Sequence, residues 1–152
     1  MRHSFSHKIH VSLRDELEEL FFFNPRQSLF RSGIESALEK WGIPEIIQKS
    51  NVIVLSLPKL RDAQCLFTIT DGPHVVAAAI FHRPCFQVFQ INHLAVVDGR
   101  WHDDLTVENI VKLTTIASQL NGVSTILFPY CFKSLKWQPR SDFPPNQTKK
   151  LL

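Results

Sequence analysis

The stretch FQVFQINHLAVVDGRWHDDLTVENIVKLTTIASQLNGVSTILF, residues 86–128, decides the fold. Its first part, Phe86–Val97, is rich in Phe, Val and Ile and predicts a buried strand. Thr106–Leu120 carries apolar residues three and four positions apart, which predicts a helix with one apolar face. Asn121-Gly122 predicts the end of that helix, and Val123–Phe128 predicts a second short strand. A strand, a helix and a strand in this order predict a βαβ unit, in which the two strands are parallel.

The corner of this βαβ unit is where we expect a small-molecule site. Ligands of such units bind where the carboxyl ends of the strands meet the amino end of the helix. In this chain the corner is Val97–Leu105. The residues of that turn are therefore the predicted ligand-binding residues of the unit.

The residues before this unit predict two helices followed by mainly antiparallel strands. Ser12 and the acidic residues after it predict a helix capped by Ser12, which Asn24-Pro25 ends. A second helix is predicted for Ser28–Trp41, and a helical turn for Pro44–Lys49. The predicted strands are Asn51–Leu57, Gln64–Thr70 and His74–His82, with a hairpin turn at Asp71-Gly72-Pro73 and a break at Pro84 before the strand that begins at Phe86. The predicted fold class is α/β, with a mixed, mainly antiparallel sheet and a carboxyl-terminal βαβ unit.

Composition and charge indicate one cytoplasmic domain with an ordinary core. Of the 152 residues, 44% are hydrophobic, which suffices for one core, but no apolar run is long enough to span a membrane. The first ten residues lack the apolar segment of a secretory signal. The net charge of +3 is too small to indicate a nucleic-acid partner. We predict an amino-terminal arm at residues 1–11, a single domain at 12–139 and a flexible tail at 140–152.

Three cysteines without a CxxC spacing predict reduced thiols in the cytoplasm. Cys65, Cys85 and Cys131 lie in or beside apolar strand segments, where a free thiol behaves as a small buried hydrophobe. A cysteine nucleophile would need a histidine and a lowered pKa, and only Cys85 has a histidine, His82, near it in sequence. We therefore expect these thiols to be structural.

Histidine spacing raises the alternative of a metal site. His3, His7 and His10 would share one face if the segment were a helix. The segment lacks helix formers and cysteine or carboxylate partners, and Lys8–Val11 fits a short opening strand instead. The run His102-Asp103-Asp104 fits a turn and helix cap better than a ligand set. We predict no metal site.

This order of elements resembles the Gcn5-related N-acetyltransferase (GNAT) fold. The run Ile91-Asn-His-Leu-Ala-Val96 is similar to the family's fourth strand, which typically ends in Leu-Ala-Val. Thr68–Ala79 resembles its second and third strands, and Cys131–Pro139 resembles a later segment with an aromatic pair. The resemblance covers Ser12–Pro139 and implies an acyl-CoA N-acyltransferase-like fold with acetyl-CoA or another acyl-CoA as the cofactor.

The cofactor site that the resemblance implies departs from the family's pattern. Family members carry spaced glycines after the fourth strand, whose open backbone N–H groups cradle the pyrophosphate of coenzyme A. This chain has no glycine at those positions, and Asp103 and Asp104 would repel a pyrophosphate. The resemblance therefore implies a degenerate acyl-CoA site. The cofactor-binding residues that it implies are Leu94, Ala95, Val96, Trp101, His102, Asp104 and Thr106.

The catalytic residues that the resemblance implies are His93 and Tyr130. The family's tyrosine falls near Phe132, which has no hydroxyl group, and Tyr130 lies two residues away. His93 has an ordinary pKa that suits a general base, but the same residue fits a hydrogen-bonded strand histidine. Strand alternation places Asn92 on the opposite face from His93.

Two functions follow from these residues. The first is an acetyltransferase-like protein with a degenerate acyl-CoA site, and the alternative is a non-catalytic GNAT-fold module that regulates or binds another protein. The residues identify neither the acceptor nor the protein partner. The family adds further strands after the fifth, for which few residues remain. Either the sheet is truncated, or a second copy of the chain pairs along its exposed edge, so a homodimer is one of two hypotheses. We expect no membrane partner.

Overall fold

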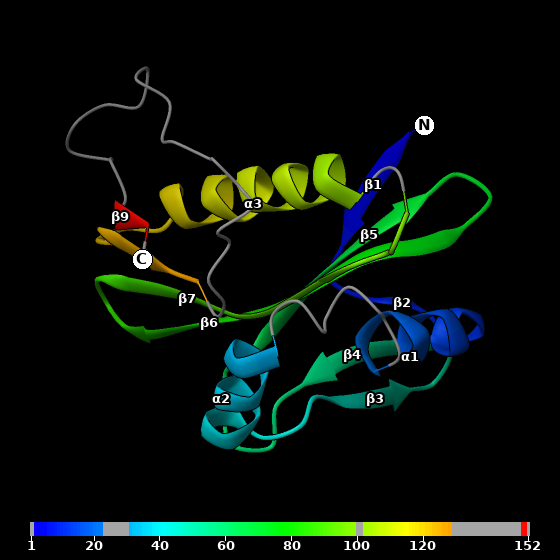
Figure 1. Cartoon of the computed structure of the whole chain (residues 1–152), viewed down its shortest axis with the longest axis horizontal. Coiled ribbons are helices and arrows are strands. Elements are labelled where there is room, and N and C mark those ends of the chain that lie inside the picture. Colours follow the sequence, from blue (N-terminus) through cyan, green and yellow to red (C-terminus); the bar gives the residue numbers. More distant parts are fainter. Residues whose placement is uncertain (1, 23–30, 100–101, 129–149, 152) are drawn as a thin grey trace.

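The computed structural model describes residues 2–22, 31–99, 102–128 and 150–151 of the chain. Side chains at 22, 31–34, 102 and 150–151 are outside this description. Figure 1 shows the elements in chain order. They are β1 (His3–Ser6), β2 (Ile9–His10), the 3₁₀ turn η1 (Val11–Leu13), α1 (Arg14–Phe22), α2 (Arg31–Trp41), β3 (Glu45–Lys49), β4 (Val52–Ser56), β5 (Gln64–Thr70), β6 (His74–Cys85), β7 (Val88–Val96), α3 (His102–Ser118), β8 (Thr125–Leu127) and β9 (Lys150–Leu151).

The main sheet is mixed and mainly antiparallel, as the sequence predicts. Its strand order is β1-β5-β6-β7-β8-β9, with antiparallel pairing from β1 to β7 and parallel pairing from β7 to β9. Helix α3 connects β7 to the parallel strand β8, so the predicted βαβ unit is confirmed. The parallel register is short and runs from Val88 opposite Thr125 to Gln90 opposite Leu127.

Both faces of the main sheet are covered, which gives the molecule three layers. Helix α3 lies on one face, and α1, α2 and the small sheet β2-β4-β3 lie on the other (Figure 1). Each face has its own apolar core because side chains alternate along the strands. The core under α3 includes Leu66, Phe81, Phe89, Ile91, Leu94, Leu113 and Ile126. The core under α1 and α2 includes Leu17, Phe21, Trp41, Ile53, Phe67, Ile80 and Ala95.

The small sheet corrects one prediction. The helical turn predicted for Pro44–Lys49 is wrong, because Glu45–Lys49 forms β3 and pairs antiparallel with β4. Two residues connect these strands, and Ser50 adopts a positive φ of 59° in the turn. The β-branched pair Ile46 and Ile47 suits a strand, and a proline before the first residue of a strand removes no ladder hydrogen bond.

The amino-terminal residues also form strands. β1 pairs with β5 and β2 pairs with β4, so the histidines at 3, 7 and 10 do not share a helical face. The prediction that Ser12 caps the first helix is wrong. The cap is His10, whose Nδ1 accepts a hydrogen bond from the Ser12 backbone N–H at 3.1 Å, and η1 precedes α1. The predicted flexible tail at residues 140–152 lies mostly outside the described residues. Within it, the structure describes Lys150–Leu151 as β9.

Two further boundaries differ from the predictions. Pro84 does not end the strand as predicted, because β6 continues to Cys85. The pairing with β7 shifts after His82, so Arg83 and Pro84 form no ladder pair. Cys85 is exposed rather than buried, whereas Cys65 is buried as predicted. Helix α3 begins at His102, one turn before the predicted start.

No helix in the described part of the chain is long and apolar enough to cross a membrane.

Candidate functional site

A β-bulge in β7 sets the geometry of the candidate site. Ile80 of β6 pairs with His93 and Phe81 pairs with Ile91, so Asn92 is the extra residue between two ladder pairs. A bulge re-aims a side chain, and here it turns Asn92 toward His82 of β6. The prediction that Asn92 and His93 occupy opposite faces is therefore wrong. Alternation fails at this one position because the strand carries one residue more than its partner.

The side chains at the bulge gather beneath the end of α2. Nδ1 of His82 donates to Oδ1 of Asn92 at 2.9 Å. The Trp41 ring meets the His82 ring at a centroid distance of 6.3 Å and the His93 ring at 6.4 Å, edge to face in both cases. Phe21 of α1 meets His93 in the same way at 6.3 Å. We call these five residues the Trp41 cluster.

Burial fixes the protonation state of His93. Its side chain is only 3% exposed, and removal from water lowers its pKa to about 4. The ring is therefore neutral at pH 7. A group with so low a pKa is a weak general base, and the aromatic rings of Phe21 and Trp41 stand against it.

Asn92 carries an unusual polar group at the centre of the cluster. The residue is fully buried, and Oδ1 is occupied by His82. Its Nδ2 donor has no hydrogen-bond acceptor among the residues that the structure describes. Buried side-chain donors are bonded in the large majority of cases, and leaving one unbonded costs about 1–3 kcal/mol. This donor is therefore available for a hydrogen bond to a group outside the described residues.

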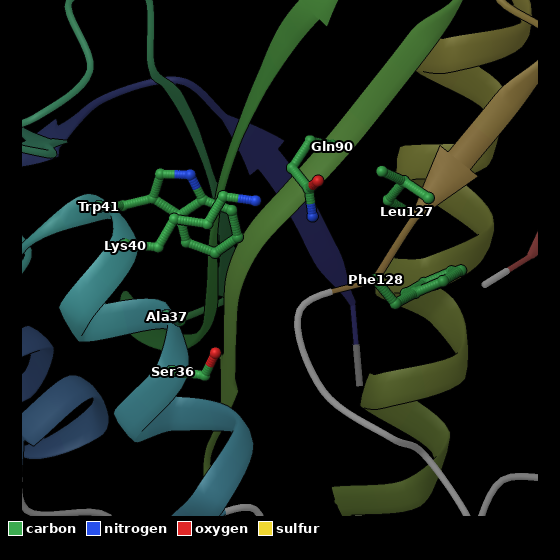
Figure 2. Close-up of a pocket in the computed structure, with 7 residues that line it drawn as sticks. All are labelled: Ser36, Ala37, Lys40, Trp41, Gln90, Leu127 and Phe128. Atoms are coloured by element: carbon green, nitrogen blue, oxygen red, sulfur yellow. The ribbon is translucent and has the colours of Figure 1, made fainter.

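A pocket of about 240 Å³ lies beside the cluster, between α2 and the β7–β8 junction. Figure 2 shows the residues of α2 on one side, Leu127 and Phe128 on the other, and Gln90 of β7 between them. The ammonium group of Lys40 lies 5.2 Å from the centroid of the Trp41 ring. Trp41 belongs to both the pocket and the cluster. The lining residues are Ser36, Ala37, Lys40, Trp41, Gln90, Leu127 and Phe128.

The pocket lies at the end of the parallel pairing between β7 and β8. Within the described chain, β8 pairs with β7 only as far as Gln90, and β7 continues for six residues beyond it to Val96. The α3 side of the sheet is filled by apolar side chains, so the opening lies on the α2 side. This position differs from the Val97–Leu105 corner, where the sequence predicts a small-molecule site.

The corner itself presents acidic groups. Asp98, Asp103 and Asp104 are exposed there, and the two at the start of α3 occupy its first turn. Carboxylates stabilise a helix at this end, so their position has a structural reason. Gly99 adopts a φ of 144° with open space around it, but no second glycine lies in the described part of the turn.

The cofactor residues implied by the resemblance do not converge on one face. Leu94 and Val96 pack in the core under α3, whereas Ala95 packs in the core under α1 and α2. Thr106 is buried and Asp104 is exposed. His93 points toward α1 and α2, away from the side of Leu94. Trp101, Tyr130, Phe132 and the side chain of His102 lie outside the described residues.

The amino-terminal histidines have separate partners. His3 Nδ1 lies 2.9 Å from a carboxylate oxygen of Glu108 on α3, and His7 Nδ1 lies 2.9 Å from the Cys65 carbonyl oxygen. His10 caps η1. No group of three metal-ligating side chains occurs within residues 2–22, 31–99, 102–128 and 150–151.

Sequence reasoning missed the pocket residues Lys40, Trp41 and Gln90 as site residues. Trp41 fits the apolar stripe of its helix and so gives no sign of a second role. The available signal is the polar run Gln90, Asn92 and His93 in an otherwise apolar strand. Comparison with known proteins finds no family model and no curated protein that matches this chain.

Proposed function

We propose that this chain is an acetyltransferase-like protein of GNAT-like fold that binds an acyl thioester, such as acetyl-CoA, in the pocket beside Trp41. The observation that carries this proposal is the pocket's position at the end of the parallel pairing between β7 and β8. The arrangement of antiparallel β5, β6 and β7 followed by α3 and a parallel strand is the one that the resemblance implies. The bulge at Asn92 adds a polar group to the same region.

The chemistry of the lining suits the arm of a coenzyme thioester. Trp41, Leu127 and Phe128 supply apolar walls for a chain of methylene and amide groups, and Gln90 and Ser36 offer amide and hydroxyl groups. The exposed Lys40 supplies a cation for a phosphate. The pocket volume is about 240 Å³, so we place only the acyl end of the ligand inside it and the nucleotide part at the surface.

Ligand binding is better supported than group transfer. His93 is neutral and enclosed by aromatic rings, and it reaches a substrate only after Trp41 or Phe21 moves. This enclosure favours, as a second candidate, a non-catalytic module that binds the thioester or another protein without transferring the acyl group. An assay for acetyl transfer to a panel of amines separates the two candidates once binding is established.

Calorimetric titration of the full chain with acetyl-CoA tests the proposal, and two variants locate the site. Lys40→Ala removes the cation of the pocket, and we expect several-fold weaker binding because a phosphate loses its partner. Asp104→Asn removes a carboxylate at the Val97–Leu105 corner, and we expect unchanged affinity. Tighter binding by Asp104→Asn with unchanged binding by Lys40→Ala would place the phosphates at the corner and contradict the pocket assignment.

A further inference from the structure

The small sheet ends in a free strand edge. Its order is β2-β4-β3, so β3 pairs with β4 on one side only, and Figure 1 shows β3 as the outermost strand of this sheet. A tight turn connects β3 to β4, and the residues on either side of this turn, Lys49 and Val52, are paired. Such a hairpin joins its first pair by hydrogen bonds, and hydrogen-bonded pairs then alternate along the ladder. β3 therefore bonds to β4 through the backbone of Lys49, Ile47 and Glu45.

The other two residues of β3 direct their backbone groups away from β4. The N–H and C=O groups of Ile46 and Gln48 form no hydrogen bond with the described part of the chain. An unpaired strand edge of this kind is a template for another strand. These four backbone groups are therefore available to a partner.

The residues of β3 are complementary to a second copy of the same strand. Its sequence is Glu-Ile-Ile-Gln-Lys, with the exposed Glu45 and Lys49 two positions to either side of Ile47. If two such strands pair antiparallel about Ile47, Glu45 of each copy lies opposite Lys49 of the other. The same register places Ile46 opposite Gln48, so the outward backbone groups of both strands bond to one another. The charges and the backbone thus select the same register.

We propose that this protein forms a homodimer in which the β3 strands of two copies pair antiparallel, with Ile47 at the two-fold axis. The two three-stranded sheets then join into one continuous sheet, in the order β2-β4-β3-β3-β4-β2. Both copies use the same edge, so the assembly closes at two chains. This interaction goes beyond the proposed ligand binding and does not depend on it.

Side chains on the outer face of the small sheet add to this contact. Glu45 and Lys49 have no ion-pair partner within the described residues. Ile47 and its pairing partner Val54 on β4 are both partly exposed. In the proposed register, positions 45, 47 and 49 form the non-hydrogen-bonded pairs, in which side chains approach most closely. This spacing favours both the contact between the two Ile47 side chains and the two ion pairs.

The other strand edges lack this pattern. β1, at one end of the main sheet, has the sequence His-Ser-Phe-Ser and contains no carboxylate to face a cation. Its His3 already contacts Glu108 of the same chain. The edge of β8, where the sequence raises the hypothesis of a homodimer, pairs with β9 in the described chain. We therefore assign self-association to β3.

Exchange of the charges tests the register. Each copy contributes one short strand, and small interfaces are typical of weak complexes, so the dimer should dissociate on dilution. Glu45→Lys and Lys49→Glu each place like charges opposite one another, and each should weaken the dimer about tenfold. An equimolar mixture of the two variants should form a heterodimer of about the original strength, because every cation then faces a carboxylate. Sedimentation velocity of the full chain over a concentration series measures each case.

Two further variants serve as a control and as a test of the backbone pairing. Glu19→Lys makes the same change of charge at an exposed position of α1, and it should leave the dimer unchanged. Gln48→Pro removes an N–H group that points away from β4, so the hairpin stays paired while the dimer loses two symmetry-related hydrogen bonds. We expect Gln48→Pro to remain folded, as measured by circular dichroism, and to dimerise about tenfold more weakly.

The outcomes decide the proposal without reference to the ligand. A chain that remains monomeric at millimolar concentration overturns it. A dimer that neither charge variant weakens, or that the mixture of the two variants does not restore, overturns it as well. A dimer that responds to the charges but not to Gln48→Pro overturns the pairing of the strands. Binding of acetyl-CoA is measured separately, and its failure leaves the dimer unaffected.

Discussion

The rings of Trp41 and His93 meet edge to face at a centroid distance of 6.4 Å, with their planes at 77°. This contact joins the last residue of α2 to the middle of β7. Trp41 also lines the pocket on the same side of the sheet, together with Gln90 of β7. The end of α2 is itself anchored, since the backbone N–H of Lys59 donates to the Trp41 carbonyl oxygen at 3.3 Å. Trp41 is therefore held by the backbone on one side and contacts both the cluster and the pocket through its side chain.

The buried neutral state of His93 makes stability depend on pH. Its pKa is about 4 in the folded chain and 6.5 in the unfolded chain, so only the unfolded chain takes up a proton between these values. Its contribution to the free energy of unfolding is therefore complete above about pH 6.5 and falls as the pH decreases toward 4, by about 3 kcal/mol. Urea denaturation at several pH values measures this. His93→Leu, which cannot titrate, should lose much less stability in this window, and an unchanged pH dependence in that variant would contradict the assignment.

A buried hydrogen bond ties α3 to β5. The hydroxyl of Thr68 donates to Oδ1 of Asn109 at 3.0 Å, and Nδ2 of Asn109 donates to the Leu105 carbonyl oxygen at 2.9 Å. Thr68→Val leaves the Asn109 oxygen without its donor and should lower the free energy of unfolding by about 1–3 kcal/mol.

Thr114→Val is the matched control for this change. It makes the same replacement at a buried threonine on α3 whose hydroxyl has no partner among the described residues. We expect it to be neutral or stabilising, because no bond is lost. Thermal denaturation of both variants gives the comparison, and equal destabilisation would show that the Thr68–Asn109 bond contributes nothing specific.

Gly122, in the loop before β8, lies close to Phe86 in the β6–β7 turn. Its φ is 84°, and an added Cβ would meet the ring of Phe86. Phe86 is 65% exposed, but it is held by Arg83, which lies over its ring at 4.7 Å and donates to the carbonyl oxygens of Phe86 and Asn121. Gly122→Ala should therefore destabilise the chain by more than the roughly 1 kcal/mol that positive φ alone costs.

Gly72 provides the control for the effect of backbone strain. Its φ of 79° is similar, and an added Cβ there would meet nothing within 4 Å. Gly72→Ala thus measures the strain alone, and the difference in unfolding free energy between the two variants measures the clash. Adding Phe86→Ala to Gly122→Ala should remove that difference. If it persists, the ring is not its cause.

The cysteines should differ in reactivity. Cys65 is buried, its thiol donates to the His7 carbonyl oxygen at 3.2 Å, and burial raises its pKa. Cys85 is exposed at the end of β6. Brief treatment of the folded chain with iodoacetamide, followed by mass spectrometry of the peptides, should find Cys85 modified and Cys65 protected. Modification of Cys65 at the rate of Cys85 would show that β5 opens readily.

The sequence predicts the elements that have a strong local signal. The hairpin of β5 and β6 follows from the turn at Asp71-Gly72-Pro73, and the βαβ unit follows from the apolar face of α3 and the glycine after it. β3 was missed because its five residues show no clear period and gain their stability from pairing with β4. Such pairing between neighbouring strands is a tertiary effect that a local pattern does not contain.

The candidate site was harder to predict than the fold. Alternation along β7 gives the wrong face for Asn92, because a bulge depends on the register with β6 and leaves no mark in the local sequence. The pocket combines α2, β7 and β8, which are far apart along the chain, so no short motif contains it. The sequence shows that Gln90, Asn92 and His93 are polar residues in an apolar strand. It does not show that α2 packs against this part of the strand.

The most direct test of the account is whether the pocket beside Trp41 is the place where acetyl-CoA binds. Ser36→Trp fills the pocket from α2, whereas Glu39→Trp places the same side chain on an exposed position of that helix outside the pocket lining. Calorimetric titration with acetyl-CoA should show binding to the unmodified chain and to Glu39→Trp, and at least tenfold weaker binding to Ser36→Trp. Absence of binding to the unmodified chain at millimolar acetyl-CoA, or equal binding to both variants, would contradict the account.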